Sequence, residues 1–199
     1  TFCDYHTDLS ADPYSENKPA LDCVTGVYGV LDIINSGSAM ELDSQTIEEI
    51  QRIVELRHIH TIWFEAHYMY RHQLAQFAEQ FPGVTVKFRC GIESFDGRLR
   101  ELWNKGVRAH VCVEDVAKYF QGVCLLCCTE GDTQERILQD IAWAQEHFEY
   151  ASVNIFCENT TPVKRDHHLA QWFIRELYPQ LKRSNKIEIL INNTDLGVG

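Results

Sequence analysis

Apolar and polar positions alternate along the chain between two kinds of segment. Nearly continuous apolar runs, each of a length typical of a buried strand, predict strands at 27–34, 60–67, 84–93, 122–128, 151–158 and 186–193. Between most of these runs, apolar residues recur at helical spacing, which predicts helices at 42–56, 70–81, 96–106, 132–148 and 166–178. The pattern therefore predicts that strands and helices alternate along the chain.

Two predicted helices have a clear apolar face. In segment 42–56, a cap at Asp43 or Ser44 precedes a stripe formed by Ile47, Ile50, Ile53 and Val54. In segment 132–148 the shared face is formed by Ile137, Ile141, Ala144 and Phe148. Such a face must be buried against another element, so both helices are expected to pack on a sheet.

The predicted fold class is α/β, with a mostly parallel sheet in a single domain over residues 1–199. Strands that are apolar throughout and joined by helices are typical of parallel sheets, because crossover helices cover both faces. Six such units are fewer than the eight of a closed (β/α)8 barrel, so a partial, open barrel or a doubly wound sheet fits. In either architecture, ligands bind at the carboxyl ends of the strands.

Polar residues, with one glycine among them, lie at the carboxyl end of every predicted strand, in its last positions or directly after it. They are Asn35, Ser36, Gly37 and Ser38; Glu65 and His67; Glu93 and Ser94; Thr129 and Glu130; Glu158, Asn159 and Thr160; and Asn192, Asn193, Thr194 and Asp195. Caps and turns explain any one of these groups. Their recurrence at six strand ends indicates a binding site for a neutral or cationic ligand rich in hydroxyl groups.

The charge of the chain indicates which kind of molecule it binds. The net charge of −11 and the pI of about 5.2 argue against nucleic acid, whose binding depends on clustered Lys and Arg. A small-molecule substrate is expected instead. The sequence has no run of about 18 apolar residues and no signal-peptide pattern, so a cytoplasmic protein without a membrane partner is expected.

Most cysteines fall in or beside apolar runs, which favours reduced thiols in a core over disulfides. These are Cys90, Cys112, Cys124, Cys127, Cys128 and Cys157. The spacing of Cys124 and Cys127 is similar to that of a metal site. However, side chains three apart in a strand face opposite sides, so core packing is favoured for them.

Several short motifs resemble those of the radical S-adenosylmethionine superfamily, which has a partial (β/α)6 TIM-like barrel. They are "NSGS" (35–38), "FEAH" (64–67) and "GIESFD" (91–96), each at a predicted strand end, followed by an apolar strand and a Gly-Asp-Thr turn. The resemblance implies that Ser36, Gly37, Ser38 and Glu65 contact the amino acid end of S-adenosylmethionine (SAM). It also implies that Glu93 and Ser94 contact the ribose of SAM.

The first residues, "TFC", resemble the end of the superfamily motif Cys-x3-Cys-x-aromatic-Cys, which holds a [4Fe-4S] cluster. The resemblance implies that Phe2 is the aromatic residue and Cys3 a cluster ligand, with the two earlier cysteines before Thr1. Thiolates are the ligands that such a cluster requires. A reductant protein would supply the electron, and cleavage of SAM would give methionine and a 5'-deoxyadenosyl radical.

Within the superfamily, the chain resembles the lyases that cleave the modified base queuine to preQ1 in queuosine salvage. The substrate implied is a deazapurine base that carries a secondary amine and a diol, and an acidic protein suits that amine. The residues expected to bind it are His67, Glu158, Asn192, Asn193 and Asp195.

Two other classes of function fit the residues. Asp4, His6 and Asp8 alternate on an extended segment and can form a hydrolase metal site with His67 or His72. Alternatively, the chain is a noncatalytic nucleoside-binding module, which would bind SAM without forming 5'-deoxyadenosine. Metal content and product analysis separate these classes.

Overall fold

The computed structural model describes residues 3, 10–35 and 37–192. The chain divides into two compact units, an N-terminal unit of residues 5–89 and a C-terminal unit of residues 90–199 with 1–4. The expectation of a single domain over residues 1–199 stays a prediction.

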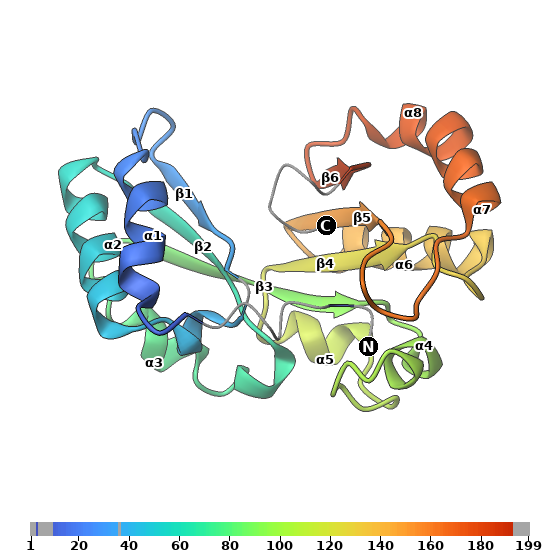
Figure 1. Cartoon of the computed structure of the whole chain (residues 1–199), viewed down its shortest axis with the longest axis horizontal. Helices are drawn as coiled ribbons and strands as arrows, with labels where there is room; N and C mark the ends of the chain where they lie inside the picture. The colour runs from blue at the N-terminus through green and yellow to red at the C-terminus, as the bar shows by residue number, and fades with distance from the viewer. Residues whose placement is uncertain (1–2, 4–9, 36, 193–199) are drawn as a thin grey trace. The chain divides into compact units, whose positions relative to one another are not determined.

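The N-terminal unit alternates helices and strands, as the apolar pattern predicts (Figure 1). Its elements are α1 (Pro13–Asp22), β1 (Val30–Ile33), the 3-10 helix η2 (Ala39–Glu41), α2 (Ser44–Leu56), β2 (Thr61–Glu65), the 3-10 helix η3 (Tyr68–Tyr70), α3 (Leu74–Ala78) and the first part of β3 (Thr85–Glu93). Strand β2 pairs in parallel with both β1 and β3. The carboxyl ends of these strands therefore share one edge.

Four phenylalanine rings form much of the core of this unit. Phe64 of β2 lies at ring-centroid distances of 5.1 Å from Phe77, 5.4 Å from Phe81 and 6.2 Å from Phe88. Phe64 itself is completely buried. The rings join β2 and β3 to α3 and the turn that follows it, which explains why this short helix is stable in its place.

Helix α2 confirms the prediction for segment 42–56. The Asp43 carboxylate accepts the Thr46 N–H at 2.8 Å, so Asp43 is the N-cap. Ile50, Ile53 and Val54 are buried along the predicted face, whereas Ile47 is only partly buried.

The sequence pattern missed helix α1, which lies beside α2 (Figure 1). Among its residues only Leu21 is buried, so the segment has no apolar stripe to detect. A local signal is present nonetheless, because Asp12 accepts the Ser15 N–H at 3.2 Å and Pro13 occupies the first helical position.

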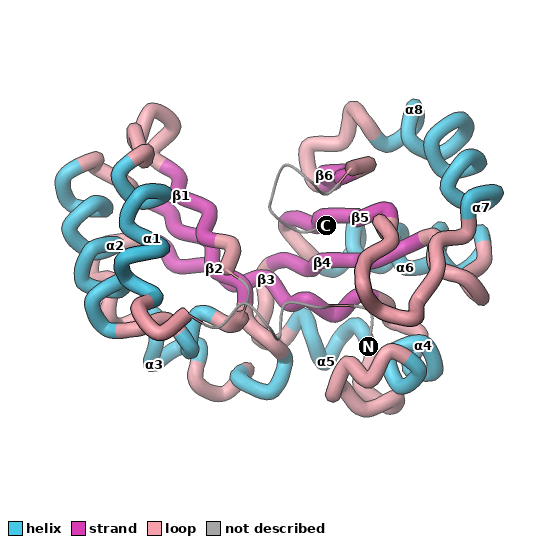
Figure 2. The backbone as a smooth tube through the Cα atoms, viewed as in Figure 1, coloured by secondary structure: helices cyan, strands magenta, loops and turns pink. Residues whose placement is uncertain are grey.

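The C-terminal unit continues the alternation of helices and strands (Figure 2). Its elements are the end of β3, α4 (Gly97–Leu102), α5 (Val113–Ala117), β4 (Gly122–Cys127), α6 (Gln134–His147), β5 (Tyr150–Ile155), α7 (His167–Trp172), the π-helix η4 (Phe173–Leu177), α8 (Tyr178–Leu181) and β6 (Ile187–Leu190). Strand β5 pairs in parallel with β4 and β6. Every residue of β4 is buried, as expected for a strand covered on both faces.

Helix α6 confirms the prediction for segment 132–148. It begins after Thr133, whose hydroxyl accepts the Arg136 N–H at 3.2 Å, and it contacts β4 and β5. Ile137, Ile141 and Ala144 are all buried, as is Phe148 just past the end of the helix. The predicted face is therefore the one that packs on the sheet.

Other segments differ from the prediction. The helix predicted at 70–81 is limited to α3. Cys112 was expected as a core thiol beside an apolar run, but it is exposed and precedes α5, because Val113 and Val116 provide the buried face of a short helix. The helix predicted at 166–178 widens into η4 and continues to Leu181. The widening precedes Pro179, which has no N–H for a bond to the turn before it.

The strands are hydrogen-bonded in the order β1-β2-β3-β4-β5-β6, which is their order in the sequence. Together with the parallel pairing, this order confirms the predicted α/β class with a mostly parallel sheet. Within the described residues, no helix is both long and apolar enough to cross a membrane.

Candidate functional site

The turn after β1 contains Gly37 and Ser38, two of the residues expected to bind SAM. The Ser38 N–H donates to Oε2 of Glu41 at 3.0 Å, and the Tyr70 hydroxyl donates to Oε1 of the same carboxylate at 2.8 Å. A Cβ atom at Gly37 would collide with this carboxylate. Glu41, which the sequence analysis did not select, therefore holds the turn in place.

Ser38 also connects this turn to the end of β2. Its hydroxyl accepts the backbone N–H of His67 at 3.0 Å, and Ser38 is buried. The His67 ring in turn caps η3, where Nδ1 accepts the Met69 N–H at 3.2 Å. His67 was expected inside a strand, but β2 ends at Glu65. Ser36, between Asn35 and Gly37, lies outside the described residues.

Asn35 carries a polar side-chain atom that forms no hydrogen bond with any described residue. Its side-chain oxygen is buried and has no hydrogen-bond partner among the described residues. A buried acceptor of this kind costs free energy unless a donor reaches it. Asn35 is therefore suited to accept a hydrogen bond from an ammonium or hydroxyl group of a ligand.

Glu65 lies beside Arg89 of β3. The Arg89 side chain is only 2% exposed, forms an ion pair with Asp32, and has its Nε atom 3.6 Å from Glu65 Oε1. Two carboxylates thus surround one buried guanidinium, which removes much of their mutual repulsion. Glu65 keeps a partly exposed side chain at this edge.

At the end of β3, Glu93 has a left-handed backbone, with φ of 65°, and is buried. Its Oε1 atom lies 2.7 Å from Nζ of Lys105. Burial opposes the charge on Lys105, but the adjacent Glu93 carboxylate outweighs this and raises the pKa of Lys105. The pair is therefore an ion pair at neutral pH.

Ser94 is completely buried. Its hydroxyl accepts the Asp96 N–H at 3.0 Å and is hydrogen-bonded to Asp140. The Asp140 carboxylate also accepts the Phe95 N–H at 3.2 Å. Ser94 thus holds the turn after β3 from inside.

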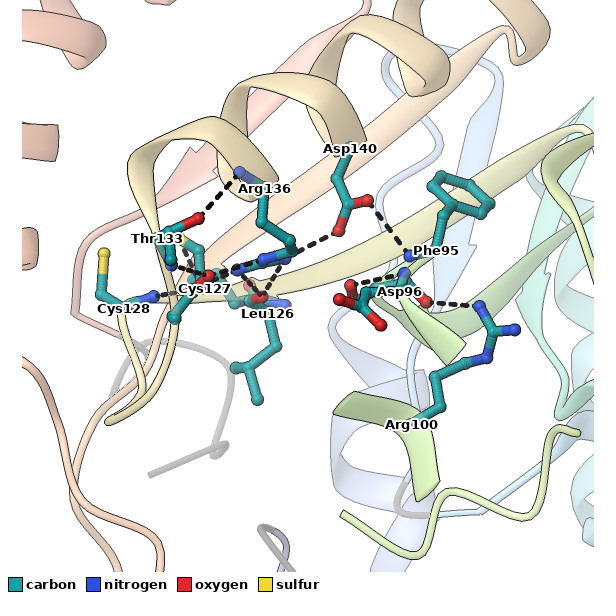
Figure 3. Close-up of polar contacts among 12 residues, drawn as sticks. Phe95, Asp96, Arg100, Leu126, Cys127, Cys128, Thr133, Arg136 and Asp140 are labelled. Atoms are coloured by element: carbon teal, nitrogen blue, oxygen red, sulfur yellow. Dashed lines mark hydrogen bonds and ion pairs between the residues drawn. The ribbon is translucent and has the colours of Figure 1, made fainter. Parts of the chain in front are cut away.

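Arg136 forms an ion pair with Asp140 (Figure 3) and a second one with Asp132. Burial disfavours charge in this cluster and raises the pKa of Asp140, even though Arg136 lies next to it. For Arg136 itself, the hydrogen bonds and charges of the two carboxylates outweigh burial and raise the pKa. The sequence analysis did not select any of these three residues.

Further polar atoms without a partner among the described residues lie just after β4, within β5 and in the loop before α7. They are Oγ1 of Thr129, Oδ1 of Asn154 and Nε of Arg165, all buried. Thr129 and Arg165 face each other in an antiparallel bridge. The sequence analysis included Thr129 because it follows an apolar strand. It did not include Asn154, because nothing in the sequence distinguishes this residue from the rest of its strand.

The residues expected to bind substrate lie on loops where they are described. Glu158 is exposed, and its carboxylate accepts the Arg165 N–H at 3.4 Å. Asn192 is exposed just after β6. Asn193 and Asp195 lie outside the described residues.

The eight cysteines, all within the described residues, form no disulfide. Cys3 is half-buried. Burial, and then the neighbouring Cys128, raises the pKa of the Cys127 thiol well above its ordinary value, as is typical of a core cysteine. In the part of the chain that the structure describes, no group of three His, Cys, Asp or Glu side chains is placed to bind a metal ion. Asp4, His6 and Asp8 lie outside that part.

A solved structure resembles this chain over its whole length. It is a queuine lyase from Clostridium spiroforme bound to SAM and queuine, with a TM-score of 0.88 and 36% sequence identity. The match covers 100% of this chain and 86% of the lyase chain, which confirms the partial (β/α)6 TIM-like barrel. A scan against protein-family models gives no match. A search of curated proteins gives no match either.

Proposed function

The chain belongs to the queuine lyase family of radical SAM enzymes, and from this premise we propose that it cleaves queuine to release preQ1. The observation that carries the proposal is the sequence identity, over the whole chain, to a lyase bound to SAM and queuine. The reaction would serve queuosine salvage, with electrons delivered by a reductant protein.

The amino acid end of SAM is assigned to the turn after β1 and to Glu65. The ammonium group of SAM needs acceptors, and the buried Asn35 oxygen and the Glu65 carboxylate are of that kind. Gly37 and Ser38 supply a turn whose shape is held by Glu41. Ser36 belongs to the same proposed contact.

The ribose of SAM is assigned to the turn after β3. Glu93 offers a carboxylate to the ribose hydroxyls, and its ion pair with Lys105 fixes its orientation. Ser94 is buried and bonded to Asp96 and Asp140, so its proposed part is to hold the turn that presents Glu93. Positioning of this kind matters because the cofactor carries the hard chemical step.

A [4Fe-4S] cluster is assigned to Cys3 as one of its thiolate ligands. Cys3 fits as one ligand, because it is a half-buried thiol outside any disulfide and thiolates are the ligands of such clusters. When bound, the cluster supplies the electron that cleaves SAM to methionine and a 5'-deoxyadenosyl radical.

The substrate is assigned to His67, Glu158, Asn192, Asn193 and Asp195. A carboxylate such as Glu158 pairs with the secondary amine of queuine, and amide groups suit its diol and ring edge. A polar group that bound queuine pairs, and that a wrong base covers without pairing, would cost about 1 to 3 kcal/mol, which is the proposed source of selectivity.

The proposal is tested with anaerobically reconstituted full-length protein, SAM, queuine and dithionite. We expect 5'-deoxyadenosine and preQ1 to form together, and Glu158→Gln to raise the KM for queuine without changing the affinity for SAM. Formation of 5'-deoxyadenosine without preQ1 would contradict the proposal that queuine is the substrate. SAM binding without 5'-deoxyadenosine would instead favour a noncatalytic nucleoside-binding module.

A further inference from the structure

All three nitrogen atoms of the Arg136 guanidinium group contact protein oxygen atoms, among them those of Asp140 and Leu126 (Figure 3). Its Nε atom donates to Asp132 at 2.6 Å, its Nη1 atom donates to Asp140 at 2.7 Å, and Nη2 forms an ion pair with Asp132. Nη1 and Nη2 also lie 3.3 Å from the Leu126 carbonyl oxygen of β4. The Arg136 side chain is only 10% exposed.

Each of the two carboxylates also accepts a hydrogen bond from a backbone N–H just after a strand. Asp132 accepts the Cys128 N–H at 2.9 Å, directly after β4. Asp140 accepts the Phe95 N–H at 3.2 Å, two residues after β3. Both aspartate side chains are almost completely buried. Arg136 thus joins the turn after β3 to the turn after β4.

Both turns contain a backbone conformation that L-residues rarely adopt. Glu93 has φ of 65° and Cys128 has φ of 66°, and neither is glycine. Such residues cost free energy and persist only where the surrounding contacts determine the backbone. The carboxylates held by Arg136 supply such contacts at the N–H of Cys128 itself and at the N–H of Phe95, two residues after Glu93.

The same two turns present side chains suited to a ligand. Glu93 lies two residues before Phe95, whose N–H donates to Asp140. Thr129 directly follows Cys128, and its hydroxyl is buried and has no partner among the described residues. We propose that Arg136 is a positioning residue that keeps these two turns at a fixed spacing, so that SAM binding depends on it. The proposal rests on the SAM-binding part of the proposed function.

Arg136→Lys in the full-length protein tests this proposal. Lysine keeps the charge but cannot form the forked contact with both aspartates and Leu126. We expect at least about tenfold weaker SAM binding in equilibrium dialysis, the size expected when one hydrogen bond to a charged group is lost. We also expect more 5'-deoxyadenosine per preQ1 formed. The matched control is Arg98→Lys, whose side chain is 92% exposed, and both readouts should stay unchanged.

Asp140→Asn provides a second test if Arg136→Lys does not fold. The amide still accepts the Phe95 N–H but loses the ion pair, so SAM binding should weaken while the fold is kept. If Arg136→Lys does fold, adding Asp140→Asn to it should have little further effect, because the two residues act through one contact.

Three outcomes are decisive. Folded variants that bind SAM as the wild type does, with an unchanged product ratio, would overturn the positioning role. A lower melting temperature with unchanged SAM affinity would overturn it as well, since the cluster would then serve stability alone. If the wild type fails to cleave queuine while Arg136→Lys weakens SAM binding, the substrate proposal fails and the positioning role holds.

Discussion

Nζ of Lys105 lies 2.7 Å from Oε1 of Glu93, and the two side chains are only 17% and 10% exposed. Lys105 follows α4, where its N–H donates to the Arg100 carbonyl oxygen at 2.9 Å. Arg100 is completely buried and bonds the carbonyl oxygens of Ser94 and Val111 at 2.8 Å and 2.7 Å. Arg100 therefore joins the loop that carries Lys105 to the turn after β3.

Lys105→Met should destabilise the protein by about 3 to 5 kcal/mol, because it leaves the Glu93 carboxylate buried without its cation. Urea unfolding measures this change. The matched control is Lys118→Met, which removes an exposed ion pair with Asp115 and should change stability little. Equal effects of the two substitutions would contradict a buried ion pair at Glu93.

The same pair predicts a loss of stability at high pH. The pKa of Lys105 is raised in the folded protein, so the folded state holds this proton more tightly than the unfolded state. Its contribution is complete below the ordinary lysine pKa of about 10.4 and is lost as the pH rises from there through the raised value. Unfolding curves between about pH 9 and 12 should show a steeper fall for the wild type than for Lys105→Met.

Gly37→Ala should disrupt the turn after β1, because the new methyl group meets the Glu41 carboxylate. We expect lower stability and weaker SAM binding, measured by thermal melting and equilibrium dialysis. Glu41→Ala removes the obstacle, so Gly37→Ala should cost less in that background. An equal cost in both backgrounds would show that the carboxylate is not the cause.

Ser38→Ala should destabilise the protein by about 1 to 3 kcal/mol, because the His67 N–H at the end of β2 loses its acceptor. Chemical unfolding measures this loss. Ser44→Ala is the matched control, since Ser44 is exposed at the start of α2. A Ser38→Ala protein as stable as the control would mean that water replaces the hydroxyl at no cost.

Cys3→Ser should abolish the visible absorbance of an iron–sulfur cluster and the formation of 5'-deoxyadenosine, because it removes a thiolate ligand. Cys112→Ser, at an exposed position before α5, should change neither property. Iron and sulfide content after anaerobic reconstitution checks the result. If Cys3→Ser holds as much iron as the wild type, Cys3 is not a ligand of the cluster.

Elements with strong local patterns were predictable. Helices α2 and α6 have buried faces at the predicted positions, and their caps, Asp43 and Thr133, stand directly before them in the sequence. Helix α1 was missed because it buries little apolar surface, and its stability depends on its contact with α2. A segment that takes its stability from a neighbour shows no periodicity of its own.

The alternation of apolar strand segments and helices, and the polar residues at each strand end, are properties of the sequence itself, because they arise from spacing within a few residues. Burial is not, since no residue of β1 is buried although its segment reads as a buried strand. Only the tertiary structure decided what each polar group does. Glu93 is paired across 12 positions with Lys105, Arg89 across 57 with Asp32, and the Phe95 N–H across 45 with Asp140. Contacts over such separations depend on which strands and helices become neighbours, and local spacing carries no information about that choice.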